Sequence, residues 1–188
     1  PWFRATGLVD VREDALAEVG DLYGVPRNGQ YGDLEAALDH VGADAVVINT
    51  PSEVHAAQCR SALERGRHVL VAKPFTDDYE QAVALVELAR AQGVTLSVAQ
   101  QVRYNRHYTA LRQFVASGGL GQVEAAWFMN SKPRPDPANL VGMVQPSLYE
   151  NACHHFDAFL AVFAAAIPEW IMCDGFVPSW SPYAGPCM

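Results

Sequence analysis

Short apolar runs alternate regularly with helical segments through about the first hundred residues, and this alternation restricts the fold more than any other feature of the chain. The run Asp44–Thr50 is almost continuously apolar, as in a parallel strand that is covered on both faces. His68–Ala72 and Thr95–Ala99 repeat the pattern, and Ala5–Asp10 is a shorter version of it. This order predicts an α/β fold with a Rossmann-type, doubly wound parallel sheet and right-handed crossovers.

Glycines and acidic residues mark the ends of the predicted helices. We expect helices over Glu13–Tyr23, Asp33–Asp39, Val54–Arg65 and from Asp77 to Gly93. Gly24, Gly66 and Gly93 are stop signals, because glycine adopts the left-handed conformation that ends a helix without strain. Asp77 and Asp78 favour the positive end of the helix dipole, so they indicate a helix start.

The second half of the chain changes character near residue 120. We expect a helix over Tyr108–Ser117, strands over Val123–Asn130 and Glu169–Cys173, a proline-rich loop over Lys132–Pro146 and a helix over Ser147–Phe163. So few elements cannot bury a two-sided sheet. We therefore predict a truncated dinucleotide-binding domain over residues 1–120, followed by an incomplete α+β domain over residues 121–188 that begins the substrate and oligomerisation domain.

Charge and cysteine usage exclude several classes of protein. The formal net charge of -8 argues against nucleic acid and anionic membrane surfaces, because phosphates attract a basic face. No apolar run is long enough to span a bilayer. The four cysteines form no C-x-x-C pair, which is typical of free thiols in a reducing cytosol. We expect a cytoplasmic protein that binds neither nucleic acid nor membrane.

Asp10 ends the first apolar run, where dinucleotide-binding folds place an acid on the adenosine ribose. Acids are common at strand ends, so a solvated side chain is the alternative interpretation. Arg12 lies nearby and would suit the 2′-phosphate of NADP, whereas Asp10 favours NAD. The sequence holds no G-x-G-x-x-G turn before Asp10, and we expect it to be incomplete at both ends.

Two further segments follow predicted strands directly. Thr50 and Pro51 end one strand, and open parallel sheets bind their ligands at the carboxyl ends of strands. The alternative is a simple strand stop, with Ser52 capping the next helix. Lys73 ends the next strand before Pro74, and a lysine in a cleft can polarise an oxygen. A surface lysine in a turn is the competing interpretation.

The predicted helix after residue 147 carries an acid, an imidazole and a second acid. At about 100° per residue, Glu150, His154 and Asp157 share one face. The roughly opposite face holds the apolar side chains of Leu148, Phe156, Phe159 and Phe163. We expect His154 to serve chemistry and His155 to pack or hydrogen-bond. A solvated helix face and a metal site are alternatives.

Four segments, in this order, resemble the glucose–fructose oxidoreductase / inositol dehydrogenase / MocA (Gfo/Idh/MocA) family. They are Asp44–His55, Ala62–Pro74, Gly118–Val123 and Glu150–Asp157. The second resembles the most recognisable segment of the family, which usually ends Glu-Lys-Pro, and the fourth resembles its Asp-x-Gly-x-His-x-x-Asp helix. The resemblance covers nearly the whole chain.

This resemblance implies reversible hydride transfer between NAD or NADP and a secondary alcohol of a sugar or polyol. It implies catalytic roles for Lys73, Glu150 and His154. The positions expected at the substrate are Lys73, Arg103, His154 and Asp157. The positions expected at the cofactor are Asp10, Arg12, Asn49, Thr50, Pro51, His55 and Lys73. Together with Asp10, the resemblance favours NAD slightly, and it implies a homo-oligomer at full length.

Two positions depart from the family pattern. Ala72 stands where the family usually has Glu, and Glu150 stands where Asp is commoner. The lost acid beside Lys73 motivates a second hypothesis, a non-catalytic protein of the same fold that senses a dinucleotide or a sugar. A third hypothesis is a metal-dependent lyase or hydrolase that uses His154 and the neighbouring carboxylates.

Overall fold

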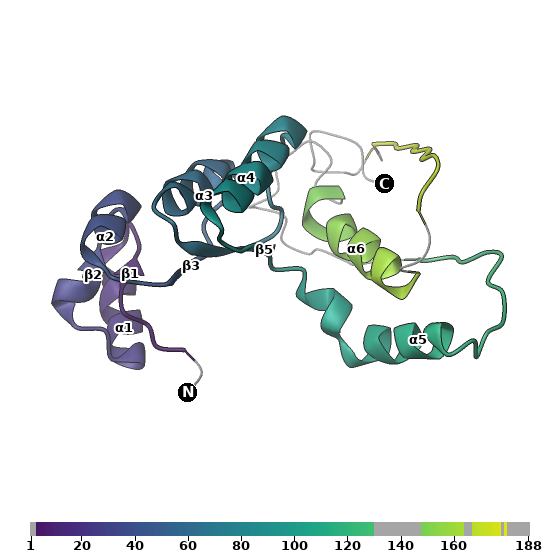
Figure 1. Ribbon diagram of the computed structural model, residues 1–188, viewed down its shortest axis with the longest axis horizontal. Helices are drawn as coiled ribbons and strands as arrows, with labels where there is room; N and C mark the ends of the chain where they lie inside the picture. Colours follow the sequence, from purple (N-terminus) through teal and green to yellow (C-terminus); the bar gives the residue numbers. More distant parts are fainter. Residues whose placement is uncertain (1–2, 130–147, 164–166, 178, 180–188) are drawn as a thin grey trace. The chain divides into compact units, whose positions relative to one another are not determined.

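The chain divides into two compact units (Figure 1), and the computed structural model describes residues 3–129, 148–163, 167–177 and 179. Unit 1 is Pro1–Ala99 and unit 2 is Gln100–Met188. The predicted domain boundary after residue 120 stays a prediction.

Unit 1 begins with a small β-α-β-α arrangement. Its elements are β1 (Leu8–Val9), α1 (Glu13–Tyr23), β2 (Gln30–Tyr31) and α2 (Leu34–His40). The two strands are parallel, with Leu8 opposite Gln30. Gly24 has a φ of 68° and its N–H donates to the carbonyl of Gly20, so a left-handed glycine ends α1 as predicted.

A three-stranded parallel sheet forms the rest of unit 1. Its elements in chain order are β3 (Ala45–Ile48), the 3-10 turn η2 (Ser52–Val54), α3 (His55–Glu64), β4 (His68–Val71), α4 (Tyr79–Gln92) and β5 (Leu96–Val98). The strands lie in the order β3-β4-β5, and Val71 pairs with both Ile48 and Val98. The predicted Rossmann-type α/β class is confirmed, although β1 and β2 form a separate sheet.

The core of unit 1 lies between this sheet and the helices α3 and α4, which cover one of its faces (Figure 1). The buried core residues are Leu38, Ile48, Cys59, Ala62, Leu63, Val69, Val71, Leu85 and Ala89. On the other face, Val47 is 71% exposed and Leu70 is 41% exposed. The prediction that β3 is covered on both faces is therefore wrong within the described residues. Two successive right-handed crossovers in one direction place both helices on the same side.

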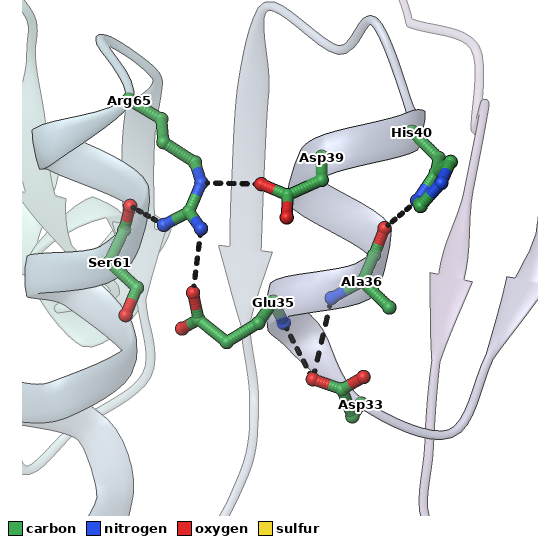
Figure 2. Close-up of polar contacts among 7 residues, drawn as sticks. All are labelled: Asp33, Glu35, Ala36, Asp39, His40, Ser61 and Arg65. Carbon is green, nitrogen blue, oxygen red and sulfur yellow. Dashed lines mark hydrogen bonds and ion pairs between the residues drawn. The ribbon is translucent and has the colours of Figure 1, made fainter.

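Acidic caps and an ion-pair cluster fix the ends of the helices in unit 1. The Asp33 carboxylate accepts from the backbone N–H groups of Glu35 and Ala36, and it caps α2 (Figure 2). Asp78 caps α4 in the same way by accepting from the backbone N–H of Gln81 at 2.9 Å. The predicted start of this helix is therefore confirmed.

Arg65, the residue after α3, joins α3 to α2 (Figure 2). Its guanidinium contacts Asp39 at 3.0 Å and Glu35 at 2.8 Å, and it also donates to the carbonyl of Ser61. The hydrogen bond to Asp39, above all, raises the pKa of Arg65 above its ordinary value. Because exposed ion pairs contribute little to stability, the cluster orients the two helices more than it stabilises them.

The described part of unit 2 is mainly helical. Its helical elements are the 3-10 turn η3 (Gln101–Tyr104), α5 (Arg106–Ala116), the π-helical turn η4 (Leu148–Ala152) and α6 (Cys153–Val162), and α6 packs against α5 and η3. The strands predicted over Val123–Asn130 and Glu169–Cys173 are wrong for the residues described there, because neither segment pairs with a neighbouring strand. Residue 130 and the predicted loop Lys132–Pro146 lie outside the described residues.

Candidate functional site

The carboxyl ends of β3 and β4 lie side by side in unit 1. Ile48 pairs with Val71, and the Ala72 N–H donates to the Ile48 carbonyl at 2.8 Å. Thr50 and Lys73 each lie two residues beyond this pair, so both leave the sheet at the carboxyl ends of the strands. Open parallel sheets bind their ligands at these ends.

The structure thus brings together four positions that the sequence assigned to the cofactor: Asn49, Thr50, Pro51 and Lys73. Lys73 is half-buried, and it precedes Pro74 through a cis peptide bond. The contact of these residues with a dinucleotide stays a prediction.

His55 lies beside the same edge as the first residue of α3. Only 1% of its surface is exposed. Its Nδ1 is 2.8 Å from the carbonyl oxygen of Pro74, and its Nε2 is 2.9 Å from the carbonyl oxygen of Thr50. Both ring nitrogens therefore face the backbone. The predicted contact of His55 with the cofactor remains a prediction.

Gln58 belongs to this edge as well, although the sequence reasoning missed it. The Thr50 hydroxyl donates to Gln58 Oε1 at 2.7 Å. Gln58 lies three residues after His55 on α3, and this i, i+3 spacing was the signal that both face the same turn. The predicted cap by Ser52 does not form, because the chain enters α3 through the 3-10 turn η2, whose cap position, Pro51, has no side-chain donor or acceptor.

Asp10 directly follows β1, at the carboxyl end of that strand. Its backbone N–H donates to the carbonyl of Tyr31, which continues the pairing of β1 with β2. Its carboxylate accepts from the backbone N–H of Arg12 at 2.8 Å, and the side chain is 44% exposed. The guanidinium of Arg12 lies between two carboxylates, 4.0 Å from Asp10 and 3.8 Å from Asp14. Arg12 is therefore already engaged with anions.

In unit 2, two positions that the sequence assigned to the substrate form an ion pair. Arg103 of η3 lies 3.3 Å from the Oδ1 of Asp157 on α6. The other oxygen of Asp157, Oδ2, is buried and has no hydrogen-bond partner among the described residues. The same holds for Oε1 of Gln100, which the sequence reasoning missed because it sits in an irregular turn. Buried acceptors without donors are costly, so both oxygens are candidates for a hydrogen bond from a ligand hydroxyl or a water.

The two adjacent histidines of α6 have different surroundings. His154 is 9% exposed, whereas His155 is half-buried against the ring of Phe128, with ring centroids 4.5 Å apart. Burial lowers the pKa of His155 below its ordinary value. The prediction that His155 packs is confirmed by this ring contact.

The helical face predicted around His154 is only partly regular. Glu150 lies in the π-helical turn η4, which changes the angle between it and α6, and its side chain lies outside what the structure describes. On the predicted apolar face, Phe156 is 56% exposed and Phe159 is 39% exposed. The predicted apolar face is therefore only partly packed: Phe159 packs against Phe163, with ring centroids 4.8 Å apart, whereas Phe156 is largely exposed and the buried residues of α6 include the small Ala158 and Ala161.

Across the described ranges, no group of three or more His, Cys, Asp or Glu side chains is placed to hold a metal ion. No helix there has the length and apolar character that crossing a membrane requires.

Known proteins place these features in a family. A model of the Gfo/Idh/MocA oxidoreductase family, with an NAD-binding Rossmann fold, matches residues 2–100. An uncharacterized oxidoreductase of Schizosaccharomyces pombe is 37% identical over 93 residues, which cover 50% of this chain and 25% of that protein. Myo-inositol 2-dehydrogenase of Thermotoga maritima is 23% identical over 170 residues, covering 90% of this chain and 50% of the enzyme.

A solved dehydrogenase structure is also similar to this chain. Scyllo-inositol dehydrogenase of Lactobacillus casei, solved with bound NAD(H) and scyllo-inositol, has a TM-score of 0.59 and 25% identity. The match covers 63% of this chain and 34% of that one. The chain spans between a quarter and about half of the length of these curated relatives.

Proposed function

Because the chain belongs to the Gfo/Idh/MocA family of oxidoreductases, whose fold binds NAD, we propose that it serves reversible hydride transfer between NAD(H) or NADP(H) and a secondary alcohol of a sugar or polyol. The observation that carries this proposal is the position of Lys73 two residues beyond the carboxyl end of β4, level with Thr50, which lies two residues beyond β3. Relatives that are named as inositol dehydrogenases support the substrate class.

The residues present suit a dinucleotide. Asp10 offers an exposed carboxylate at a strand end, which can accept from ribose hydroxyls. The turn at Thr50 and Pro51 lies at the carboxyl ends of the strands, where open parallel sheets bind their ligands. Arg12 is held by two carboxylates, so its charge is partly used, and this favours NAD over NADP. The nicotinamide supplies the hydride chemistry, and the protein supplies alignment and charge.

Lys73 stabilises negative charge on the substrate oxygen as the hydroxyl proton leaves. A fixed ammonium is worth most where charge develops in the reaction, because it needs no reorganisation at that moment. Because Lys73 follows β4, the central strand of the sheet, the backbone that carries its side chain has a defined position. This role makes Lys73 a catalytic residue and not a general binding residue.

His154 accepts the proton of the substrate hydroxyl. Imidazole is suited to this task, because its protonation changes near neutral pH. The ring is almost wholly buried and therefore held by packing. By the family resemblance, Glu150 orients it.

Asp157 binds substrate hydroxyls. Its Oδ2 is buried and has no donor among the described residues, whereas its Oδ1 is paired with Arg103. A polyol hydroxyl would satisfy this oxygen, and the pairing with Arg103 orients the carboxylate. Arg103 then acts on the substrate through Asp157.

One observation favours a second candidate function. Ala72 replaces the acid that usually precedes the lysine, and a protein without that charge could bind a dinucleotide or sugar without converting it. Turnover of any polyol would exclude this alternative.

The test is nicotinamide reduction by the full-length gene product on a panel of sugars and polyols, with NAD and NADP side by side. Lys73→Met should lower kcat by about 100-fold or more while the Kd for the cofactor stays within about threefold. Arg60→Met, which removes an exposed cation from α3 in the same unit, is the matched control and should leave both constants unchanged. Equal losses of turnover and cofactor binding in Lys73→Met would contradict the role of Lys73.

A further inference from the structure

His55 connects the two turns that follow β3 and β4 at the carboxyl ends of these strands. Its Nε2 faces the carbonyl of Thr50 after β3, and its Nδ1 faces the carbonyl of Pro74 after Lys73. Thr50 and Lys73 occupy equivalent places beyond the paired strands β3 and β4. One ring therefore spans the gap between the end of one strand and the segment that carries the lysine.

The chemistry of these contacts makes His55 an unusual core residue. Carbonyl oxygens only accept, so each contact is a hydrogen bond when the facing nitrogen carries a proton. The neutral ring donates to one of the two carbonyls, and the doubly protonated ring donates to both. A ring that is 1% exposed cannot exchange these partners for water, so removing it leaves buried acceptors without donors.

A second hydrogen bond, from a side chain of α3, fixes the position of Thr50. The Thr50 hydroxyl donates to Gln58, one turn after His55 on α3. Helix α3 thus holds Thr50 through its carbonyl and its hydroxyl, and it holds the Lys73–Pro74 turn through the same histidine. The helix itself is anchored by Cys59, Ala62 and Leu63, which are fully buried.

We propose that His55 is a positioning residue that acts through Lys73, because its ring fixes the Lys73–Pro74 turn relative to the Thr50–Pro51 turn. The inference rests on the proposed function of Lys73. This role replaces the cofactor contact predicted from the sequence, because both ring nitrogens of His55 face backbone carbonyls. Its loss displaces the ammonium without removing it, and a displacement of about 1 Å from the reacting geometry costs about 100-fold in rate.

A double-mutant cycle on the full-length protein tests this proposal. His55→Phe keeps an aromatic ring but has no donor, and we expect it to lower kcat about 10- to 100-fold with an unchanged Kd for NAD. In the Lys73→Met background, the same change should cause no further loss, because there is no ammonium left to position. His55→Gln retains a donor group, the side-chain NH₂, and should recover part of the loss in kcat. The proposal would be overturned if the kcat losses of the two single variants multiplied in the double variant. It would also be overturned if His55→Phe raised the Kd for NAD and left kcat unchanged.

A measurement independent of turnover reports on Lys73 directly. Reductive methylation with a ¹³C label gives each lysine its own NMR signal, and the 188 residues contain two lysines, Lys73 and Lys132. The Lys73 signal is identified by its loss in Lys73→Met. We expect it to shift in His55→Phe and to stay in place in Leu63→Val, which loosens the buried side of the same helix without touching either turn.

The two readouts separate the two claims. A wild-type protein that oxidises no polyol contradicts the proposed function, and the Lys73 signal then decides the positioning role by itself. An unchanged Lys73 signal in a folded His55→Phe overturns the positioning role, whatever the turnover. If His55→Phe fails to fold, His55→Gln takes its place in both experiments, with the same criteria.

Discussion

The guanidinium of Arg103 lies 3.3 Å from the carboxylate of Asp157, and this pair joins η3 to α6 in unit 2. Only one oxygen of the Asp157 carboxylate, Oδ1, takes part in this ion pair. The other, Oδ2, is buried and lacks a donor among the described residues. A buried carboxylate oxygen of this kind can accept a hydrogen bond from a hydroxyl, and a polyol supplies several.

Replacing Asp157 with Asn should therefore impair substrate recognition. Charge-assisted hydrogen bonds to a buried acceptor are worth about 1.5–3 kcal/mol, so we expect kcat/KM for the polyol to fall roughly 10- to 100-fold. The Kd for the cofactor should not change. Asp174→Asn, at an exposed carboxylate of the same unit, is the control and should have no effect. Equal kcat/KM values in wild type and Asp157→Asn would contradict the substrate role.

Asp10 should decide the preference between the two nicotinamide cofactors. In Asp10→Ser, the carboxylate that would accept from the ribose hydroxyls is lost, and Arg12 is released from one of its two anionic neighbours. We expect the KM for NAD to rise about 10-fold and the KM for NADP to fall. Steady-state kinetics with both cofactors measure this ratio. An unchanged ratio would show that Asp10 is a solvated strand end.

Cys59 should be chemically silent in the folded protein. Burial raises the pKa of its thiol to about 11, so at pH ~8 roughly one thiol in a thousand is ionised. Alkylation followed by peptide mass analysis should label exposed Cys173 quickly and Cys59 only after unfolding. Because the folded pKa lies above the ordinary value of 9.0, the contribution of this group to stability is lost as pH rises from 9.0 toward about 11. Rapid labelling of native Cys59 would contradict its burial.

His155 should make unit 2 sensitive to acid. Its pKa is lowered by burial, so the unfolded chain takes up a proton more readily than the folded chain, and stability falls as pH drops below about 6.5. His155→Phe keeps a ring against Phe128 but removes the titration. Urea unfolding at pH ~7.5 and ~5.5 should show a smaller loss of unfolding free energy in this variant, with turnover within about threefold of wild type. A larger loss of unfolding free energy in His155→Phe than in the wild type would contradict the role of His155 in acid sensitivity.

Local sequence signals predicted much of unit 1. Gly24 and Gly93 end their helices in left-handed conformations, and Asp78 caps the helix that the acidic pair indicated. Such signals act within one turn of a helix, so one sequence suffices to read them. Continuous apolar runs likewise located β3, β4 and β5 within two residues at each end.

The rest depends on contacts between distant segments. His55 faces carbonyls on two turns, and Arg103 pairs with a residue far along the chain, and no local pattern encodes either contact. The π-helical turn before Cys153 breaks the regular angle on which the face of Glu150 and His154 was predicted. Alternating polarity over 123–129 predicted a strand, but a strand forms only where a partner completes its hydrogen bonds.

Transfer of deuterium is the most direct test of the central claim, that this family member serves hydride transfer from a polyol carbon. The full-length protein is incubated with NAD and a polyol that carries deuterium on its carbinol carbons, and the reduced cofactor is isolated for mass spectrometry. We expect the reduced nicotinamide to carry deuterium in the wild type and to be about 100-fold less abundant with Lys73→Met. Bound NAD that stays oxidised across the whole polyol panel would contradict the claim and indicate a binding protein.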